Sequence, residues 1–134
     1  MTSESSAKTM LITGGLFGLL SVVLGAFAAH GLSQVFSPAQ LDTWQTGVAY
    51  QMYHSLVLLF SGLWLLQGGP AVLRAAGWLF ILGIIAFSGS IYGLAFTSAW
   101  WLGPVTPLGG LSLISGWLCL CVAGLQSITR GDRA

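Results

Sequence analysis

The stretch AAGWLFILGIIAFSGSIYGLAF, residues 75–96, contains no charged residue and determines the class of fold. A helix rises about 1.5 Å per residue, so this stretch is long enough to cross the roughly 30 Å hydrocarbon core of a bilayer. Three further apolar runs of similar length lie around it. Of the 134 residues, 5% are charged, whereas soluble proteins contain about 25%. The sequence therefore predicts an all-α protein, a bundle of four transmembrane helices.

Turn and capping residues separate the four runs. Ser37, Pro38 and Gln40 combine an N-cap, a first-turn proline and a capping-box glutamine, so we expect the second helix to begin there, before its membrane-spanning part. Gly31 follows the first run as a helix-ending residue. The predicted spans are residues 9–30, 47–66, 71–96 and 107–128, within a single integral membrane domain formed by residues 1–134. An alternative for the first run is a secretory signal cleaved near Ala28, which would leave three spans.

The positive charges predict the orientation in the membrane. With four spans, both termini lie on the same side, and all four basic residues fall on that side. These residues are Lys8, Arg74, Arg130 and Arg133. Because cytoplasmic loops carry an excess of Lys and Arg, we expect cytoplasmic N- and C-termini. Trp44, Trp100 and Trp101 are then expected to form an aromatic belt at the outer surface.

Charge and motifs argue against several functions. The net charge of +1, with no run of basic residues, excludes a nucleic-acid partner. His54 and Ser88 supply a base and a hydroxyl, but no G-x-S-x-G motif surrounds the serine and no carboxylate within a span could orient the histidine, so we expect no enzyme. His30 and His54 differ in depth, which disfavours a haem or metal site. We therefore expect no cofactor.

Polar residues gather in the outer half of the predicted bundle and form the candidate site. Polar side chains that faced lipid would lose their hydrogen bonds, so we expect these to converge on the bundle interior. The candidate residues are His30, Tyr50, His54, Ser88, Ser90, Tyr92 and Thr106. They either bond to one another and fix the helices, or form a site for an unidentified small ligand or ion. In both cases His54 is expected to be neutral, with Ser88 and Tyr92 as neighbours.

Small residues predict where helices pack closely. Gly14 and Gly18 in the first span, and Gly89 and Gly93 in the third, have the G-x-x-x-G spacing that lets helix backbones approach one another. We favour packing within one chain and keep a homo-oligomer contact as the alternative.

Several ordered motifs resemble those of a known family. They are Gly25-Ala26-Phe27-Ala28-Ala29-His30-Gly31-Leu32, Tyr50 with His54, Phe87-Ser88-Gly89-Ser90-Ile91-Tyr92, Thr106-Pro107-Leu108-Gly109-Gly110 and Gly116-Trp117. From about Met10 to Leu125 the chain resembles the YgdD-like small inner-membrane proteins, also called domain of unknown function 423 or uncharacterised protein family 0382, which are similar to eukaryotic transmembrane protein 256. Ala28 departs from the glycine usual there. The resemblance implies a multi-pass protein of the bacterial inner membrane and implies no activity.

The sequence thus leaves two hypotheses for function. The favoured one is a structural or interaction protein of the lipid bilayer. The alternative is a small carrier or channel-like protein that binds an ion or a polar solute near His54.

Overall fold

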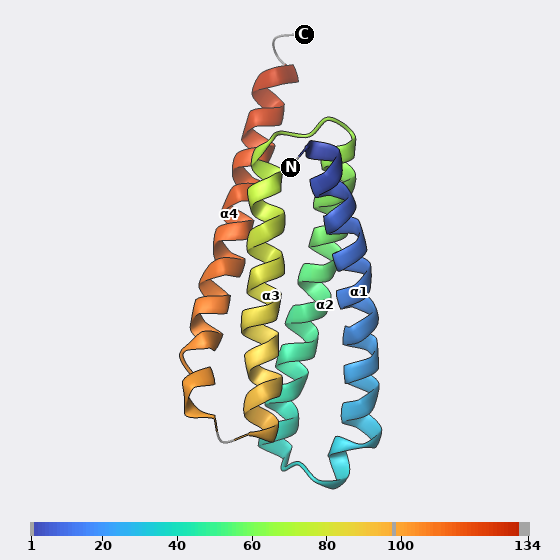
Figure 1. The fold of residues 1–134 in the computed structure, drawn as a ribbon, viewed down its shortest axis with the longest axis vertical. Coiled ribbons are helices and arrows are strands. Elements are labelled where there is room, and N and C mark those ends of the chain that lie inside the picture. The colour runs from blue at the N-terminus through green and yellow to red at the C-terminus, as the bar shows by residue number, and fades with distance from the viewer. Residues whose placement is uncertain (1, 98, 132–134) are drawn as a thin grey trace.

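The computed structural model describes residues 2–97 and 99–131, and within them the chain forms four long helices (Figure 1). The helices are α1 (Ser3–His30), α2 (Pro38–Leu66), α3 (Val72–Phe96) and α4 (Val105–Gly131), with short 3₁₀ turns η1 (Leu32–Gln34) and η2 (Trp100–Leu102) before α2 and α4. Each long helix is apolar and long enough to cross a membrane. The prediction of an all-α, four-span protein is confirmed, whereas the orientation of the termini stays a prediction.

Local capping explains the helix boundaries. The predicted capping box is present, because the Ser37 hydroxyl accepts a hydrogen bond from the Gln40 backbone N–H and the Gln40 side chain accepts one from the Ser37 N–H. The α2–α3 turn depends on Gly68, whose φ of 83° lies in the left-handed region. α3 begins at Val72, one residue after the predicted start, and α4 extends three residues past its predicted end, to Gly131.

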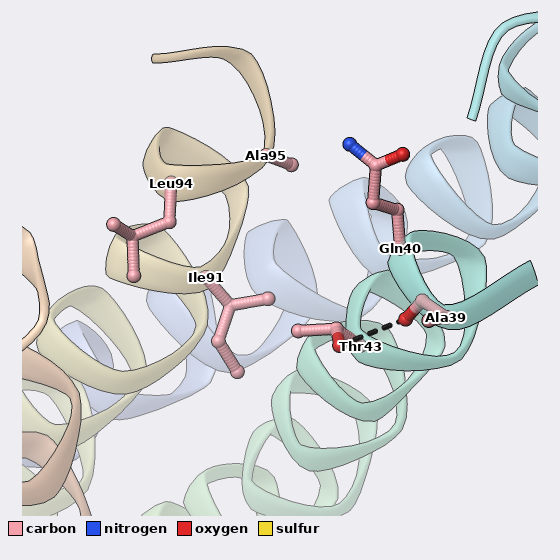
Figure 2. Close-up of a pocket in the computed structure, with 6 residues that line it drawn as sticks. All are labelled: Ala39, Gln40, Thr43, Ile91, Leu94 and Ala95. Atoms are coloured by element: carbon pink, nitrogen blue, oxygen red, sulfur yellow. Dashed lines mark hydrogen bonds between the residues drawn. The ribbon is translucent and has the colours of Figure 1, made fainter. Parts of the chain in front are cut away.

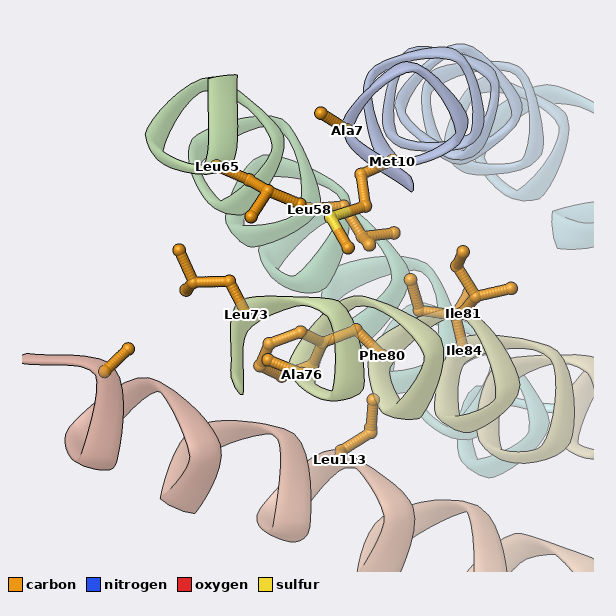
Figure 3. Close-up of a cluster of buried hydrophobic side chains, with 11 residues drawn as sticks. Ala7, Met10, Leu58, Leu65, Leu73, Ala76, Phe80, Ile81, Ile84 and Leu113 are labelled. Carbon is orange, nitrogen blue, oxygen red and sulfur yellow. The ribbon is translucent and has the colours of Figure 1, made fainter. Parts of the chain in front are cut away.

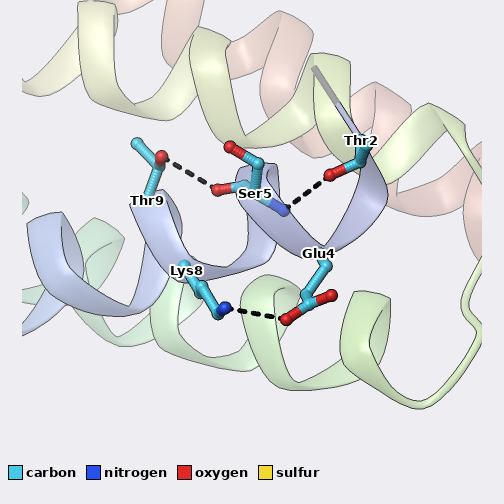
Figure 4. A network of polar contacts seen from close by, with 5 residues as sticks. All are labelled: Thr2, Glu4, Ser5, Lys8 and Thr9. Atoms are coloured by element: carbon cyan, nitrogen blue, oxygen red, sulfur yellow. Dashed lines mark hydrogen bonds and ion pairs between the residues drawn. The ribbon is translucent and has the colours of Figure 1, made fainter.

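α1 begins six residues earlier than its apolar run predicts. The Thr2 hydroxyl caps it by accepting a hydrogen bond from the Ser5 N–H at 3.2 Å, and the Lys8 ammonium lies 2.7 Å from the Glu4 carboxylate one turn away (Figure 4). Hydropathy missed this turn because its residues are polar. The turn extends the helix beyond the part that an apolar run can identify.

The four helices form an open array. Across Figure 1 they lie side by side in the order α4, α3, α2, α1. α1 packs along α2, α2 along α3 and α3 along α4, whereas α1 and α3 touch only lightly. Within the described residues the extensive helix packing of α4 is with α3. The array is therefore not closed on all sides, and α4 leaves room between itself and α2.

Two groups of buried apolar side chains hold the array together. The larger contains residues from all four helices, among them Met10, Leu58, Phe80 and Leu113 (Figure 3). The smaller centres on Trp44, which is 2% exposed and whose indole N–H donates to the Leu24 carbonyl at 3.1 Å. The expectation that Trp44 belongs to an outer aromatic belt is therefore wrong, because its ring is packed between helices, whereas Trp100 and Trp101 are exposed.

The glycine predictions hold for α1 and fail for Gly89. A Cβ on Gly14 would lie 3.0 Å from the Ser55 carbonyl oxygen of α2, and one on Gly18 would lie 3.4 Å from the Ser55 hydroxyl. A Cβ on Gly89 would meet nothing within 4 Å, so this glycine does not mediate close helix packing. Gly93 lies against the Leu102 side chain of η2, not against another long helix. Spacing shows which residues share a face but not whether that face meets a helix or lipid.

A close approach of the α3 and α4 backbones lies at Gly109, which the spacing argument did not select. A Cβ there would overlap the backbone nitrogen of Phe87 and would lie 2.8 Å from the Ala86 carbonyl carbon. Backbone atoms cannot move aside as a side chain can, so only glycine fits at this point of the interface.

We therefore expect opposite effects from one substitution at two glycines. Gly109→Ala should lower the free energy of unfolding by about 1–3 kcal/mol, as overpacking does in other cores. Gly89→Ala should leave it unchanged or raise it by up to about 1 kcal/mol, because alanine is the better helix former and its methyl group meets open space. Unfolding in mixed micelles measures both, and equal effects would contradict the α3–α4 contact.

Candidate functional site: a groove between α2 and α4

His54 of α2 is held at both ring nitrogens. Its Nδ1 lies 2.6 Å from the Tyr50 carbonyl oxygen, and its Nε2 lies 3.1 Å from the Trp117 indole nitrogen of α4. A carbonyl only accepts hydrogen bonds and an indole N–H only donates, so the proton lies on Nδ1 and Nε2 is the acceptor. This pattern fits a neutral imidazole, as expected from the sequence. It also joins α2 directly to α4.

Trp117 is the residue that sequence reasoning missed. The expected neighbours of His54 were Ser88 and Tyr92 of α3, but both have other partners, so that expectation is wrong. Depth along a helix can be estimated from sequence, whereas the choice between two neighbouring helices cannot. The available signal was Gly116, which has no side chain and so lets α4 pack closely on the Phe80 ring of α3. A Cβ added at Gly116 would lie 2.7 Å from that ring. This close packing brings the next residue, Trp117, beside His54.

Tyr92 belongs to a separate chain of hydrogen bonds. Its hydroxyl donates to the Gln51 side-chain oxygen at 3.0 Å, and the Gln51 amide donates to the Phe17 carbonyl at 2.8 Å. Three helices, α3, α2 and α1, are thereby linked through two side chains. Gln51 was not among the predicted site residues, although its place beside Tyr50 in the sequence was a usable signal.

The predicted serines and threonine bond in pairs elsewhere. The Ser88 hydroxyl donates to the Gly47 carbonyl at 2.7 Å, which joins α3 to α2. The hydroxyls of Ser90 and Thr106 lie 2.7 Å apart and join α3 to α4. His30 is exposed at the end of α1. The structure thus divides the seven predicted residues among several local contacts instead of gathering them at one point.

Tyr50 and His54 do share one feature, a groove between α2 and α4 with α3 as its floor. The groove has a volume of about 580 Å³ and is mostly apolar. Its lining residues are Tyr50, Tyr53, His54, Phe87, Gly110, Leu113, Ile114 and Trp117. The Tyr50 ring is 42% exposed and stacks on Phe87 with ring centroids 4.8 Å apart. Since these residues come from the middle of the helices, the groove opens on the side of the array.

A second hollow lies between the start of α2 and the end of α3 (Figure 2). It has a volume of about 270 Å³ and is lined by Ala39, Gln40, Thr43, Ile91, Leu94 and Ala95. The Thr43 hydroxyl donates to the Ala39 carbonyl at 3.0 Å, and the Gln40 side-chain oxygen serves the capping box. These polar groups stabilise the first turn of α2. The hollow therefore offers less to a ligand than the larger groove.

Comparison with known proteins adds the family. The family described as "Protein of unknown function (DUF423)" matches residues 24–110. A UPF0382 membrane protein of Staphylococcus epidermidis is 43% identical over 89% of this chain and 97% of its own length. The UPF0382 membrane protein YwdK of Bacillus subtilis is 42% identical over 89% of this chain and 98% of its own length. The chain belongs to this family.

No solved structure matches the chain. The relatives' names describe membrane proteins, and together with four helices of spanning length they show that this DUF423 protein is a multi-pass membrane protein. The part matched by the family, residues 24–110, includes the α2 and α3 sides of the groove and only the first turns of α4.

The bond between His54 and Trp117 predicts a measurable coupling. In a double-mutant cycle of His54→Leu and Trp117→Phe, we expect an interaction energy of about 0.6 kcal/mol, the mean for hydrogen bonds between transmembrane helices, and at most about 1.7 kcal/mol. Unfolding in mixed micelles measures each variant. The matched cycle of His54→Leu with Tyr92→Phe should give a value near zero, because the Tyr92 hydroxyl bonds to Gln51. A larger interaction energy for His54 with Tyr92 than for His54 with Trp117 would show that His54 pairs with Tyr92, as the sequence predicted.

Proposed function

We propose that this DUF423 protein is a non-enzymatic binding protein of the membrane, and that its binding surface is the groove between α2 and α4. The observation that carries the proposal is a mostly apolar pocket of about 580 Å³ on the side of a helical array. Ligand pockets in proteins measure roughly 300–1,000 Å³ and are lined mainly by apolar and aromatic side chains. The groove meets both criteria.

The polar groups around the groove favour binding over chemistry. Both nitrogens of His54 are engaged, one with a backbone carbonyl and one with an indole N–H. The hydroxyls of Ser88 and Ser90 are engaged as well, with Gly47 and Thr106. General acid–base or nucleophilic catalysis needs a group that can exchange a proton or attack a substrate. These side chains instead serve as connections between helices.

The position of the groove favours a partner that reaches it through the bilayer. Tyr53 and Ile114, on opposite sides of the groove, are both more than half exposed. In a membrane these surfaces face hydrocarbon. A molecule that dissolves in the bilayer can approach from this side without crossing the headgroups.

The alternative is a carrier for an ion or polar solute near His54. An ionisable residue within a span is a functional candidate in general, and His54 does line the groove. A polar solute that bound the imidazole would have to displace one of its two hydrogen bonds, and apart from the hydroxyls of Tyr50 and Tyr53 the rest of the lining is aromatic and aliphatic carbon. The apolar partner is therefore the better supported one.

Photo-crosslinking tests the proposal directly. A benzophenone amino acid at Ile114, which lines the groove and is 57% exposed, should capture one defined molecule in cell membranes. The matched control is the same amino acid at Leu118, one turn further along α4 and 61% exposed, but outside the groove lining. Mass spectrometry of the purified protein identifies the adducts.

The expected result is an adduct at position 114 that position 118 does not form. The same mixture of bulk-lipid adducts at both positions would refute the proposed groove function. An adduct consisting of a second copy of this chain at position 114 would show that the groove is a homo-oligomer contact and would refute ligand binding.

A further inference from the structure

Two tyrosine hydroxyls at the groove have no hydrogen-bond partner within the described residues. They belong to Tyr50 and Tyr53, which both line the groove. The third tyrosine of the chain, Tyr92, donates to Gln51. A hydroxyl that enters hydrocarbon without a hydrogen bond loses about 2–7 kcal/mol relative to water. The groove therefore presents two donors that a bound molecule with acceptor oxygens would satisfy.

The depth of these tyrosines places them below the headgroups. Asp42 is exposed on α2, and because a charged side chain is costly in hydrocarbon we place this part of the helix at the membrane surface. Tyr50 and Tyr53 follow it by roughly 12 and 16 Å of helix rise. Side chains on a helix lean toward its N-terminus, so both rings lean back toward that surface. The polar end of a bound molecule would lie near the hydroxyls and its apolar part deeper, beside His54 and Trp117.

The shape of the groove favours a small flat molecule over a helix. On α4 the lining runs from Gly110 to Trp117, which is about 10 Å of helix rise. A transmembrane helix would need a groove along most of the roughly 30 Å hydrocarbon core. Four lining residues, Tyr50, Tyr53, Phe87 and Trp117, carry aromatic rings, whose faces and edges pack favourably against other rings. Such faces suit another planar ring.

The chemistry of the lining sets the charge and polarity of the ligand. No lining residue carries a formal charge, and the indole N–H of Trp117 is already donated to His54. What remains is a pair of phenol donors in an aromatic surrounding. We propose, building on the groove function above, that the site binds a neutral planar ring bearing carbonyl oxygens, the chemistry of a membrane quinone, with the hydroxyls of Tyr50 and Tyr53 donating to the carbonyls.

The test uses 2-methyl-1,4-naphthoquinone as the probe and the intact protein in bicelles. The ¹⁵N–¹H signal of the Trp117 indole, assigned by its loss in Trp117→Phe, reports on the groove. In the unmodified protein it should shift saturably with added probe. The double variant Tyr50→Phe/Tyr53→Phe keeps both rings and removes both donors, so it should bind about tenfold more weakly.

Three controls separate recognition of the carbonyls from simple partitioning. Tyr92→Phe removes a hydroxyl that is bonded to Gln51 and should leave the affinity unchanged. The probe 2-methylnaphthalene lacks the carbonyls and should bind the unmodified protein about tenfold more weakly. Gly110→Leu should abolish binding, because a Cβ there has room, 3.8 Å from the Phe87 ring, and the longer side chain fills the groove.

Two results would overturn the inference. One is the absence of a saturable shift with the naphthoquinone, and the other is equal affinity for the two probes with no effect of the tyrosine variants. If the naphthoquinone fails while crosslinking at Ile114 still captures a different defined molecule, the groove function stands and only the quinone chemistry falls. If both experiments fail, the groove is not a binding site.

Discussion

Hydrocarbon offers polar groups no water to bond with, so a buried polar side chain within a span needs a partner inside the protein. Here the partner is usually a backbone carbonyl, either of the same helix, as when Ser61 donates to Val57, or of a neighbouring helix. Ser21 of α1 donates to Val48 of α2, and Ser112 of α4 donates to Leu79 of α3, in both cases within 2.8 Å. In the described chain no buried side-chain nitrogen or oxygen lacks a hydrogen-bond partner. These bonds, with close contacts such as that at Gly109, fix which helix lies beside which.

The array has an open side between α2 and α4. α4 packs extensively on α3, and within the described residues the Trp117 indole of α4 donates a hydrogen bond to His54 of α2. The tryptophan side chain is long enough to make this contact while the two helices stay apart. Space therefore remains between the helices on the side where Tyr53 and Ile114 lie. The groove therefore follows from the order in which the helices pack, since α4 packs on α3 and not along α2.

The sequence predicts the spans well and the site only in part. Charge distribution and apolar length locate four helices, and Ser37 with Gln40 marks the start of α2 correctly, because these signals are local. Contacts between helices are not local. The spacing of Gly89 and Gly93 was as favourable as that of Gly14 and Gly18, yet Gly89 meets no helix. Likewise, the depth of His54 could not reveal that its partner is Trp117 of α4.

His54 is part of the scaffold, held between α2 and α4, and the groove beside it is mostly apolar. The most direct test is the scalar coupling across the hydrogen bond between the indole ¹⁵Nε1 of Trp117 and the imidazole ¹⁵Nε2 of His54, measured by NMR of the protein in bicelles. We expect a resolved coupling and a single neutral tautomer with the proton on Nδ1. A missing coupling, with the two tautomers of His54 in exchange as in water, would show that His54 is not held between α2 and α4.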